Sequence, residues 1–366
     1  MIDRNKVKIF SLSERENYQL NFNELNTSHI NLQMSDENRK NIEELANKIR
    51  IAKRDNKPII YSFGAHLIKN GLSPVLVKLM KEGFVTHFAT NGAGSIHDLE
   101  FALVSKSGEN VSDNVKSGTF GTWEETGAII NGAILRYGIE DCGYGEAVGK
   151  AIKDSGDISF FSEEYLEGKL NAALKNKRFK EASALSDLLA KYDILKKSGL
   201  NFKYLNKENS LQYWSAKENI PLTIHPGIGY DIIYLHPFCT PSAIGRACEI
   251  DFLRFVKSVK ELDGGGVYLS IGSAIMSPMI FEKSLSFANN LRIYDEGKEK
   301  ISDFEIAVVD LQDGGNWDWQ SGEPPKDNPA YYLRFCKTFS RMGGNLRYLQ
   351  LDNRKFLYAL LKELMN

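Results

Sequence analysis

The chain has 366 residues, of which 42% are hydrophobic and 25% charged, so it can form one large α/β domain or two smaller ones. Its formal net charge of -1 provides no global attraction to nucleic acid or to an anionic membrane. No apolar run approaches the roughly 20 residues that a membrane-spanning helix needs, and four scattered cysteines without a CxxC pair argue against structural zinc. We therefore expect a cytoplasmic protein with reduced thiols, no bound metal, and no nucleic-acid or membrane partner.

Residues 1–54 are predicted to form an N-terminal arm followed by a helix. The first 36 residues are polar and irregular, as in an arm that packs on the body or on a neighbouring subunit. The apolar stripe Ile42, Leu45 and Ile49, with Ser35 or Asp36 as N-cap, predicts a helix over 36–54. Residues 55–366 are predicted to form a single domain.

The segment 58–103 alternates strand, turn and helix twice. Residues 58–62 and 85–90 are short apolar runs of the kind found in buried parallel strands. Each run is followed by a turn that contains glycine and then by a helix, at 72–81 and at 97–103. Ligands of open α/β sheets bind beyond the carboxyl ends of the strands, so these polar turns are the first place to expect chemistry.

The middle of the chain is predicted to be helical. Helices are expected over 122–137 and 143–154, and a charged helical insertion over about 160–200. A solvated helix pair accounts for the insertion, and shaping a pocket mouth or a subunit contact is the alternative.

The last third returns to alternating strands and helices. Residues 220–237 (IPLTIHPGIGYDIIYLHP) are predicted to hold two strands joined by a tight turn. Strands at 267–271 and 306–311 and helices at 242–260, 277–291 and 355–365 follow. The alternation predicts a doubly wound, mainly parallel sheet of the Rossmann-like α/β class.

Glycine-bearing turns at strand ends point to a nucleotide. A helix that begins after such a turn offers unpaired N–H groups and a positive dipole end to phosphate. Neither a GxGxxG fingerprint nor a P-loop is present. The residues expected to bind the cofactor are Gly64, His66, Asn91, Gly92, Ala93, Gly94, Ser95, Asp98, Gly272, Ser273 and Asp313.

Several titratable side chains lie in or near these turns. His97 or His225 could move protons, and Asp231, after the Gly227–Gly229 turn, could hold a cationic substrate. Helix capping is an equally good account of Asp98. The spacing of His225, Asp231 and His236 matches no zinc signature.

The loop 313–325 (DGGNWDWQSGEPP) combines carboxylates with tryptophans. Carboxylates attract an ammonium group, and an exposed indole face adds cation–π attraction. The residues expected to bind an amine substrate are Asp231, His236, Trp317 and Glu323. Packing beneath a subunit interface would explain the tryptophans equally well.

At these positions the chain resembles the deoxyhypusine synthase family, over about residues 58–337. Residues 73–100, the segment 220–236 with Asp231, the Gly272-Ser273-Ala274 turn and residues 312–337 are similar to family segments. The resemblance implies a Rossmann-like NAD-binding fold, a homo-oligomer (dimer or tetramer), and a lysine that attacks an imine formed when NAD oxidises a polyamine. Lys337 falls near that lysine.

The chain also departs from the family pattern. Phe335-Cys336-Lys337 stands where the family has Trp-Gly-Lys, and His97-Asp98 stands where it has an acidic pair. Three hypotheses follow. The chain is an NAD-dependent enzyme that acts on an amine through Lys337, an NAD-dependent oxidoreductase or lyase without a covalent lysine, or a nucleotide-binding protein without catalysis. In the first, His97, His225, Asp231 and Lys337 are the catalytic residues.

Overall fold

A computed structural model describes residues 2–25, 30–154, 161–198 and 202–366. The chain divides into two compact units, which we call the helical unit (1–24, 95–219 and 226–251) and the sheet unit (25–94, 220–225 and 252–366). The sequence placed an insertion at about 160–200. In the structure, this region belongs to the helical unit, which also contains 95–159 and 226–251.

The sheet unit contains a parallel sheet of six strands within its described residues. The strands are β2 (Ile59–Phe63), β3 (His87–Thr90), β5 (Leu222–Ile224), β6 (Gly266–Ile271), β7 (Phe304–Asp310) and β8 (Asn345–Gln350). Their spatial order is β5-β3-β2-β6-β7-β8, and every neighbouring pair is parallel. Counted along the chain, this is the order 3-2-1-4-5-6 of dinucleotide-binding folds. The predicted Rossmann-like, doubly wound α/β class is therefore confirmed.

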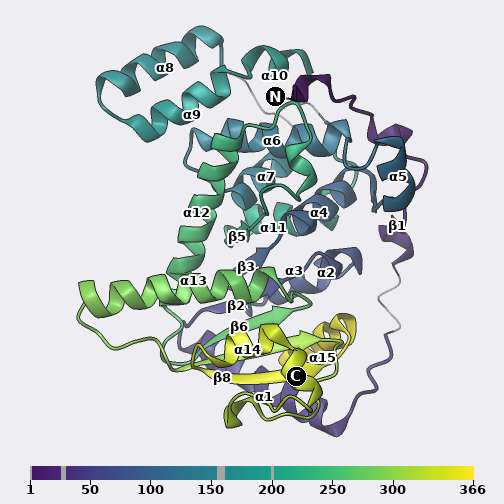
Figure 1. Cartoon of the computed structure of the whole chain (residues 1–366), viewed down its shortest axis with the longest axis vertical. Coiled ribbons are helices and arrows are strands. Elements are labelled where there is room, and N and C mark those ends of the chain that lie inside the picture. The colour runs from purple at the N-terminus through teal and green to yellow at the C-terminus, as the bar shows by residue number, and fades with distance from the viewer. Residues whose placement is uncertain (1, 26–29, 155–160, 199–201) are drawn as a thin grey trace. The chain divides into compact units, whose positions relative to one another are not determined.

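Helices form layers on the sheet (Figure 1). One layer contains α1 (Asp36–Arg54), α3 (Ser73–Lys81) and α15 (Asn353–Met365). Helix α15 contacts both α1 and α3, and α1 and α15 also contact strands of the sheet. A second layer is formed by α13 (Met276–Asn290), α14 (Arg334–Ser340) and the end of α12 (Pro241–Lys260). The short α2 (His66–Lys69) follows β2. The predicted stripe on α1 is buried, and Ser35 accepts a hydrogen bond from the Asn38 N–H as its N-cap.

The core of the sheet unit is strongly aromatic. Tyr268 of β6 stacks on Phe281 of α13, with ring centroids 4.3 Å apart, and Phe339 of α14 packs on both. Phe255 of α12 is fully buried in the same cluster. Burial of rings of this size supplies much of the hydrophobic free energy that holds helices to a sheet.

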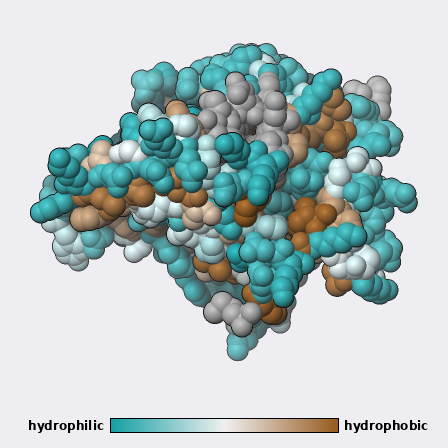
Figure 2. All heavy atoms as spheres, turned by 90° about the horizontal axis from the view of Figure 1, so that it is seen from above, coloured by the Kyte–Doolittle hydropathy of each residue, from teal (hydrophilic) through white to brown (hydrophobic). Residues whose placement is uncertain are grey.

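The helical unit consists almost entirely of helices in its described part. These are α5 (Val111–Ser117), α6 (Glu124–Gly138), α7 (Tyr144–Lys153), α8 (Glu163–Lys175), α9 (Phe179–Leu189), α10 (Tyr192–Ser198) and α11 (Leu211–Glu218), with most of α4 (Gly92–Val104) and the first half of α12. A two-stranded antiparallel ladder joins β1 (Leu20–Asn21) to β4 (Lys106–Ser107). Phe179 is 66% exposed at the start of α9, and Figure 2 shows brown hydrophobic atoms among the hydrophilic surface of this region.

Three sequence-based expectations about local structure were wrong or incomplete. Residues 232–234 form a single 3₁₀ turn rather than a second strand after β5. Helix α4 already begins at Gly92, so the Gly92–Gly94 turn is the first turn of a helix and not a loop before it. The edge strand β8 was not predicted, because its residues alternate poorly between buried and exposed. No helix in the described part of the chain is long and apolar enough to cross a membrane.

Candidate nucleotide site and buried polar groups

The order of the strands reverses between β2 and β6, and two predicted glycines lie there. Gly64 follows β2 and Gly272 follows β6, and the Gly64 N–H donates to the carbonyl of Ile271 at 3.1 Å. A Cβ on Gly64 would lie 2.1 Å from the Gly272 carbonyl oxygen, so only glycine allows the two turns to approach. Gly272 has φ of +55°, a left-handed conformation that favours glycine. The structure thus brings these two residues together at the position where dinucleotides bind in this class of sheet.

The start of α4 is the second part of the site. Asn91 follows β3, and its Oδ1 accepts a hydrogen bond from the Gly94 N–H at 2.9 Å. Gly92 and Ala93 form the first turn of the helix, where backbone N–H groups lack partners within the helix. A Cβ on Gly94 would lie 2.4 Å from Oγ1 of Thr90, so close packing on β3 explains this glycine.

The remaining expected cofactor residues of the sheet unit differ in whether a ligand can reach their side chains. The His66 side chain is exposed at the start of α2. Ser273 accepts a hydrogen bond at 3.2 Å from the N–H of Ser277, in the first turn of α13. Asp313 is exposed after β7, and its Oδ1 accepts from the Gly315 N–H at 2.9 Å. His66 and Asp313 therefore have side chains that solvent or a ligand can reach.

The side chains of Ser95 and Asp98 form hydrogen bonds with residues 210–212 inside the helical unit. The Asp98 carboxylate accepts hydrogen bonds from the Ser210 hydroxyl and from the N–H groups of Leu211 and Gln212, at 2.5 to 3.0 Å. The Ser95 hydroxyl donates to the side chain of Gln212 at 2.7 Å. Asp98 thus caps α11, a distant helix, and not the start of its own helix as the capping alternative had it, and its burial raises its pKa despite these bonds. We leave both residues out of the proposed cofactor site for this reason.

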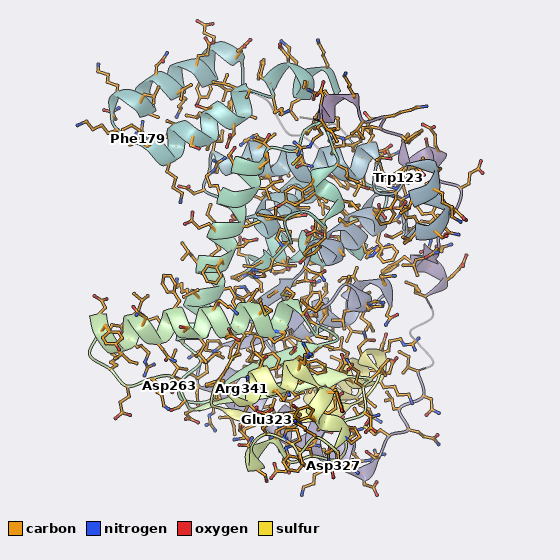
Figure 3. All side chains as sticks on the ribbon, in the orientation of Figure 1. Trp123, Phe179, Asp263, Glu323, Asp327 and Arg341 are labelled. Carbon is orange, nitrogen blue, oxygen red and sulfur yellow. The ribbon has the colours of Figure 1, made fainter. Side chains whose placement is uncertain are left out.

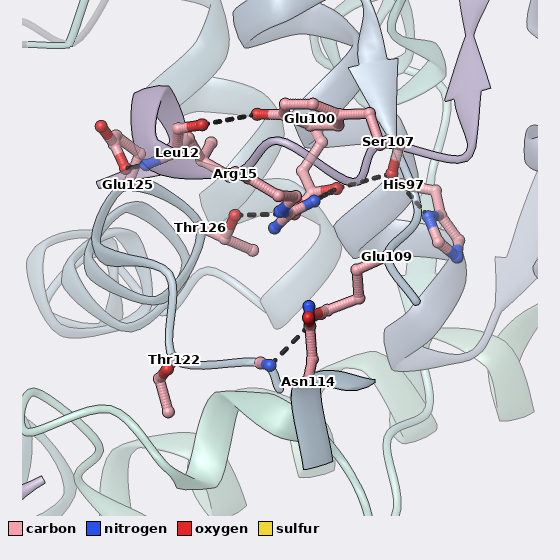
Figure 4. Close-up of polar contacts among 12 residues, drawn as sticks. Leu12, Arg15, His97, Glu100, Ser107, Glu109, Asn114, Thr122, Glu125 and Thr126 are labelled. Carbon is pink, nitrogen blue, oxygen red and sulfur yellow. Dashed lines mark hydrogen bonds and ion pairs between the residues drawn. The ribbon is translucent and has the colours of Figure 1, made fainter. Parts of the chain in front are cut away.

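His97 belongs to a buried network that the sequence did not reveal (Figure 4). Its Nδ1 lies 2.7 Å from the Ser107 hydroxyl, which donates to Glu100 at 2.6 Å. Arg15 of the N-terminal segment donates two hydrogen bonds to the same carboxylate, at 2.8 and 3.0 Å, and Thr126 donates a third at 2.9 Å. The arm is therefore fixed to the helical unit by a buried ion pair.

Neither Arg15 nor Glu100 lies in a motif, so their pairing had no signal in one sequence. Burial alone would raise the pKa of Glu100, but the charge and hydrogen bonds of Arg15 hold it below its ordinary value. The Arg15 guanidinium also lies 4.4 Å from the ring centre of Trp123. This arrangement stabilises the fold and leaves His97 at its edge.

Asp231 is a buried carboxylate without a cation. It is 9% exposed, and its Oδ2 accepts one hydrogen bond, from the Gly227 N–H at 2.7 Å. No ion pair involves Asp231 in the part of the chain that the structure describes, and burial raises its pKa. Burial, followed by neighbouring acidic groups that include Asp231, raises the pKa of Tyr234 to about 12. An ammonium group would compensate the negative charge of the Asp231 carboxylate.

The two expected histidines that follow Asp231 and β5 are both held neutral. Burial lowers the pKa of His236 to about 4, and its Nδ1 accepts from the Phe238 N–H at 3.2 Å. Burial lowers the pKa of His225 to about 3. His225, expected to move protons as an imidazole with a pKa near neutrality, is instead kept neutral by burial. The expected contact of His236 with the substrate stays a prediction. Among the described residues, no group of three or more His, Cys, Asp or Glu side chains could hold a metal ion.

Lys337 of α14 forms an ion pair with Glu323 of the preceding loop. Its Nζ lies 3.2 Å from Glu323 Oε1 and 3.8 Å from the ring centre of Tyr331. Glu323 also pairs with Arg341 at 3.1 Å, and Figure 3 shows these two residues close together. Arg341 lines a pocket with residues 300–302, which precede β7 at the amino edge of the sheet. Lys337 and Glu323 thus group with the amino edge, whereas Gly64 and Gly272 lie at the carboxyl edge.

The two tryptophans of the 313–325 loop differ in exposure. Trp319 is 4% exposed within the aromatic core, and Trp317 is partly buried against that core. The Trp317 indole N–H donates to the carbonyl of Gly322 at 2.9 Å. Trp319 therefore offers no exposed face to an amine, whereas the expected contact of Trp317 with the substrate stays a prediction.

No family model matches the chain, and no curated protein sequence matches it. Solved structures with a similar arrangement include the ternary complex of AgrE with ornithine and NAD+, at 13% identity and a TM-score of 0.45, which covers 92% of this chain and 34% of that one. A conserved putative LOR/SDH protein from Methanococcus maripaludis S2 has 14% identity and a TM-score of 0.45, covering 92% and 72%.

The arginine dihydrolase ArgZ of the ornithine–ammonia cycle in Cyanobacteria is a third similar structure. It has 16% identity and a TM-score of 0.42, covering 88% of this chain and 32% of that one. The chain spans about a third of the length of the AgrE and ArgZ chains.

Proposed function

We propose that this protein is an NAD-dependent enzyme that oxidises a small amine to an imine. The observation that carries the proposal is the 3-2-1-4-5-6 strand order, with Gly64 and Gly272 in contact at the point where the order reverses. Dinucleotides bind at this point in doubly wound sheets. Bound NAD would supply a hydride acceptor, and the residues of the sheet unit would hold its phosphates and riboses.

The residues that would hold the dinucleotide are the turns at Gly64 and Gly272 and the first turn of α4. Enzymes that use NAD hold a ribose hydroxyl with an acidic side chain about 20 residues beyond the glycine turn. The side chain after β3 is Asn91, which carries no charge. A neutral residue does not repel the additional phosphate of NADP, so both cofactors belong in the test.

The amine part of the proposal is supported by Asp231. A carboxylate has about four acceptor positions, and Asp231 uses one of them for a hydrogen bond in the described structure. An ammonium group provides three donors and a positive charge. We infer that Asp231 binds the ammonium of the substrate, and that a water or a second substrate captures the imine.

A covalent mechanism through Lys337, as in the deoxyhypusine synthase family, is the second candidate. It is favoured by the family resemblance and opposed by the ion pair with Glu323, because a lysine attacks as the neutral amine. Reduction with borohydride in the presence of a polyamine and NAD would trap a lysine adduct. Mass spectrometry would then locate it, and an adduct on Lys337 would establish this mechanism.

The cofactor proposal is tested by thermal shift with NAD and NADP at millimolar concentration. A ligand that binds only the native state raises the melting temperature by mass action. We expect Ala274→Tyr to weaken cofactor binding at least tenfold, because Ala274 is exposed beside Gly272. Ser302→Tyr is the control, since Ser302 is exposed at the opposite edge of the sheet. No shift with either cofactor in the wild type would refute the proposal.

The amine proposal has a separate test. Ornithine and putrescine are titrated by calorimetry against the wild type, Asp231→Asn and Asp141→Asn. We expect Asp231→Asn to weaken binding at least tenfold, whereas Asp141, which is exposed and has φ of +55°, accepts asparagine without effect. If a cofactor binds but no amine reduces it, the protein is a nucleotide binder without catalysis.

A further inference from the structure

Two histidines and two hydroxyls form a continuous hydrogen-bonded chain inside the sheet unit. Ser258 Oγ of α12 lies 2.8 Å from Nδ1 of His87, and Nε2 of His87 lies 3.0 Å from Oγ1 of Thr223. The same Oγ1 lies 3.0 Å from Nε2 of His225. The parallel register pairs Ala89 with Thr223, which brings the His87 side chain beside β5.

The two ends of this hydrogen-bonded chain, His225 and Ser258, lie at opposite edges of the sheet. His225 directly follows β5, and its N–H donates to the carbonyl of Thr90, so it lies at the carboxyl edge with the proposed cofactor site. Ser258 lines a pocket of about 570 Å³ with residues 55–58, Thr86 and Pro221, which precede β2, β3 and β5. The chain thus connects the carboxyl edge with a pocket at the amino edge.

The middle of the chain excludes solvent. His87 and Thr223 are fully buried. The ring of Phe255 packs edge-on against both imidazoles, with centroids 5.5 Å from each. A proton that crosses this region therefore has to pass along the side chains.

Both imidazoles are neutral at physiological pH. Burial, then the repulsion that would arise if both imidazoles were protonated, and the charge of Arg254 lower the pKa of His87 to about 3, and burial does the same for His225. A neutral imidazole has one N–H donor and one acceptor nitrogen, and a hydroxyl can donate and accept at once. Each member of the chain can therefore receive a proton on one side while it gives one up on the other.

We propose that Ser258, His87 and Thr223 form a proton relay that serves His225 and links the carboxyl edge of the sheet to the amino-edge pocket. The proposal rests on the proposed function, because oxidation of an amine to an imine removes a hydride from carbon and releases one proton from nitrogen. His87, Thr223 and Ser258 are positioning residues that act through His225.

In the outward direction, protons move from His225 toward Ser258. Nδ1 of His225 binds the released proton while its Nε2–H proton passes to Thr223, and the Thr223 hydroxyl proton passes to Nε2 of His87. The Nδ1–H proton of His87 passes to Ser258, whose hydroxyl proton leaves to water in the pocket. One proton enters and one leaves, and no member keeps a charge. A second transfer in the same direction requires both imidazoles to exchange tautomers.

The tautomers of His87 and His225 are directly measurable by ¹⁵N NMR of the full chain labelled at histidine, without any ligand. Ser258→Ala removes the last member of the chain. We expect it to change the tautomer ratio of His225 on the order of fivefold, as the loss of one net hydrogen bond implies. Ser286→Ala, an exposed serine of α13, is the matched control.

Thr223→Val keeps the shape of the side chain and removes the hydroxyl, so in this background Ser258→Ala should no longer affect His225. Thr223→Ser restores the hydroxyl and should restore the response. If Ser258→Ala alters His87 and leaves His225 unchanged, the relay is refuted and the bonds are structural. Because no cofactor is present, this result is independent of whether NAD binds.

Discussion

The ion pair between Arg15 and Glu100 gives the sharpest prediction about stability. We consider Arg15→Met, which keeps much of the aliphatic length of the side chain and removes its charge. The two side chains are 1% and 2% exposed in the wild type, so the substitution leaves a buried carboxylate without its cation. Breaking a buried pair in this way costs about 3–5 kcal/mol.

The double variant Arg15→Met/Glu100→Leu separates the ion pair from the packing. Replacing both partners of a buried pair by apolar groups is often neutral or stabilising. Here the hydroxyls of Thr126 and Ser107 both lose their acceptor on Glu100. Ser107 stays hydrogen-bonded to His97, so the unpaired Thr126 hydroxyl accounts for the cost of about 1–3 kcal/mol. We therefore expect the double variant to be more stable than Arg15→Met, although it carries one more substitution.

The pH dependence of stability tests whether the Arg15–Glu100 pair stabilises the wild type. Arg15 holds the Glu100 pKa below its ordinary value of about 4.3, so the pair stabilises the wild type above that pH and less as pH falls through the lowered pKa. In Arg15→Met, burial is opposed by His97 and by the hydrogen bond from Ser107 but no longer by Arg15, so the pKa of Glu100 should rise. The variant should thus regain stability relative to the wild type as pH falls from 7 to 4.

Hydrogen exchange monitored by mass spectrometry is the assay, because peptides from α4 and α6 report on the helical unit separately from the sheet unit. Urea is added at pH 7 and at pH 4. A loss below about 1 kcal/mol in Arg15→Met, the level of an exposed pair, would refute the reasoning. An equal loss at both pH values would refute the electrostatic account.

Three further predictions concern the packing of Gly64, the capping of α11 by Asp98 and the ion pair of Lys337. Gly64→Ala should lower the free energy of unfolding by about 1–3 kcal/mol, because its Cβ would overlap the Gly272 carbonyl, whereas Gly245→Ala, with open space around it, should not destabilise. Urea titration measures both. Asp98→Asn should cost about 1–3 kcal/mol and speed hydrogen exchange in α11. Lys337→Ala should change stability by about 0–1 kcal/mol and leave the cofactor-induced thermal shift unchanged, and loss of that shift would place Lys337 in the cofactor site.

The repeating parts of the fold could be predicted from the sequence because they depend on local patterns. Buried apolar runs marked β2, β3, β6 and β7, and the glycines after β2 and β6 marked tight turns. The edge strand β8 escaped detection because its burial does not alternate: Arg347 and Tyr348, which point to opposite faces, are both only partly buried. Residues 232–234 did not form a strand, because the Gly227–Asp231 hydrogen bond closes a compact turn before them.

The candidate site was less predictable, because single residues can be recruited by distant parts of the chain. Asp98 follows a glycine-rich turn, but its carboxylate is used by residues 210–212. Trp319 is in a polar loop, and it fills the core behind the sheet. No pattern within one sequence specifies that Arg15 meets Glu100 or that His87 meets Thr223. Such pairs depend on strand register and chain topology.

The lowered pKa of His225 has a consequence for the proposed chemistry. A group with a pKa of about 3 carries a proton in roughly one molecule in ten thousand at pH 7, so it is a poor base if it must keep the proton. Its neighbour in the relay, Thr223, is fully buried and hydrogen-bonded to it. A side chain that passes a proton on, rather than holding it, does not need a pKa near neutrality. His225 is therefore better suited to the end of a relay than to the role of an isolated base.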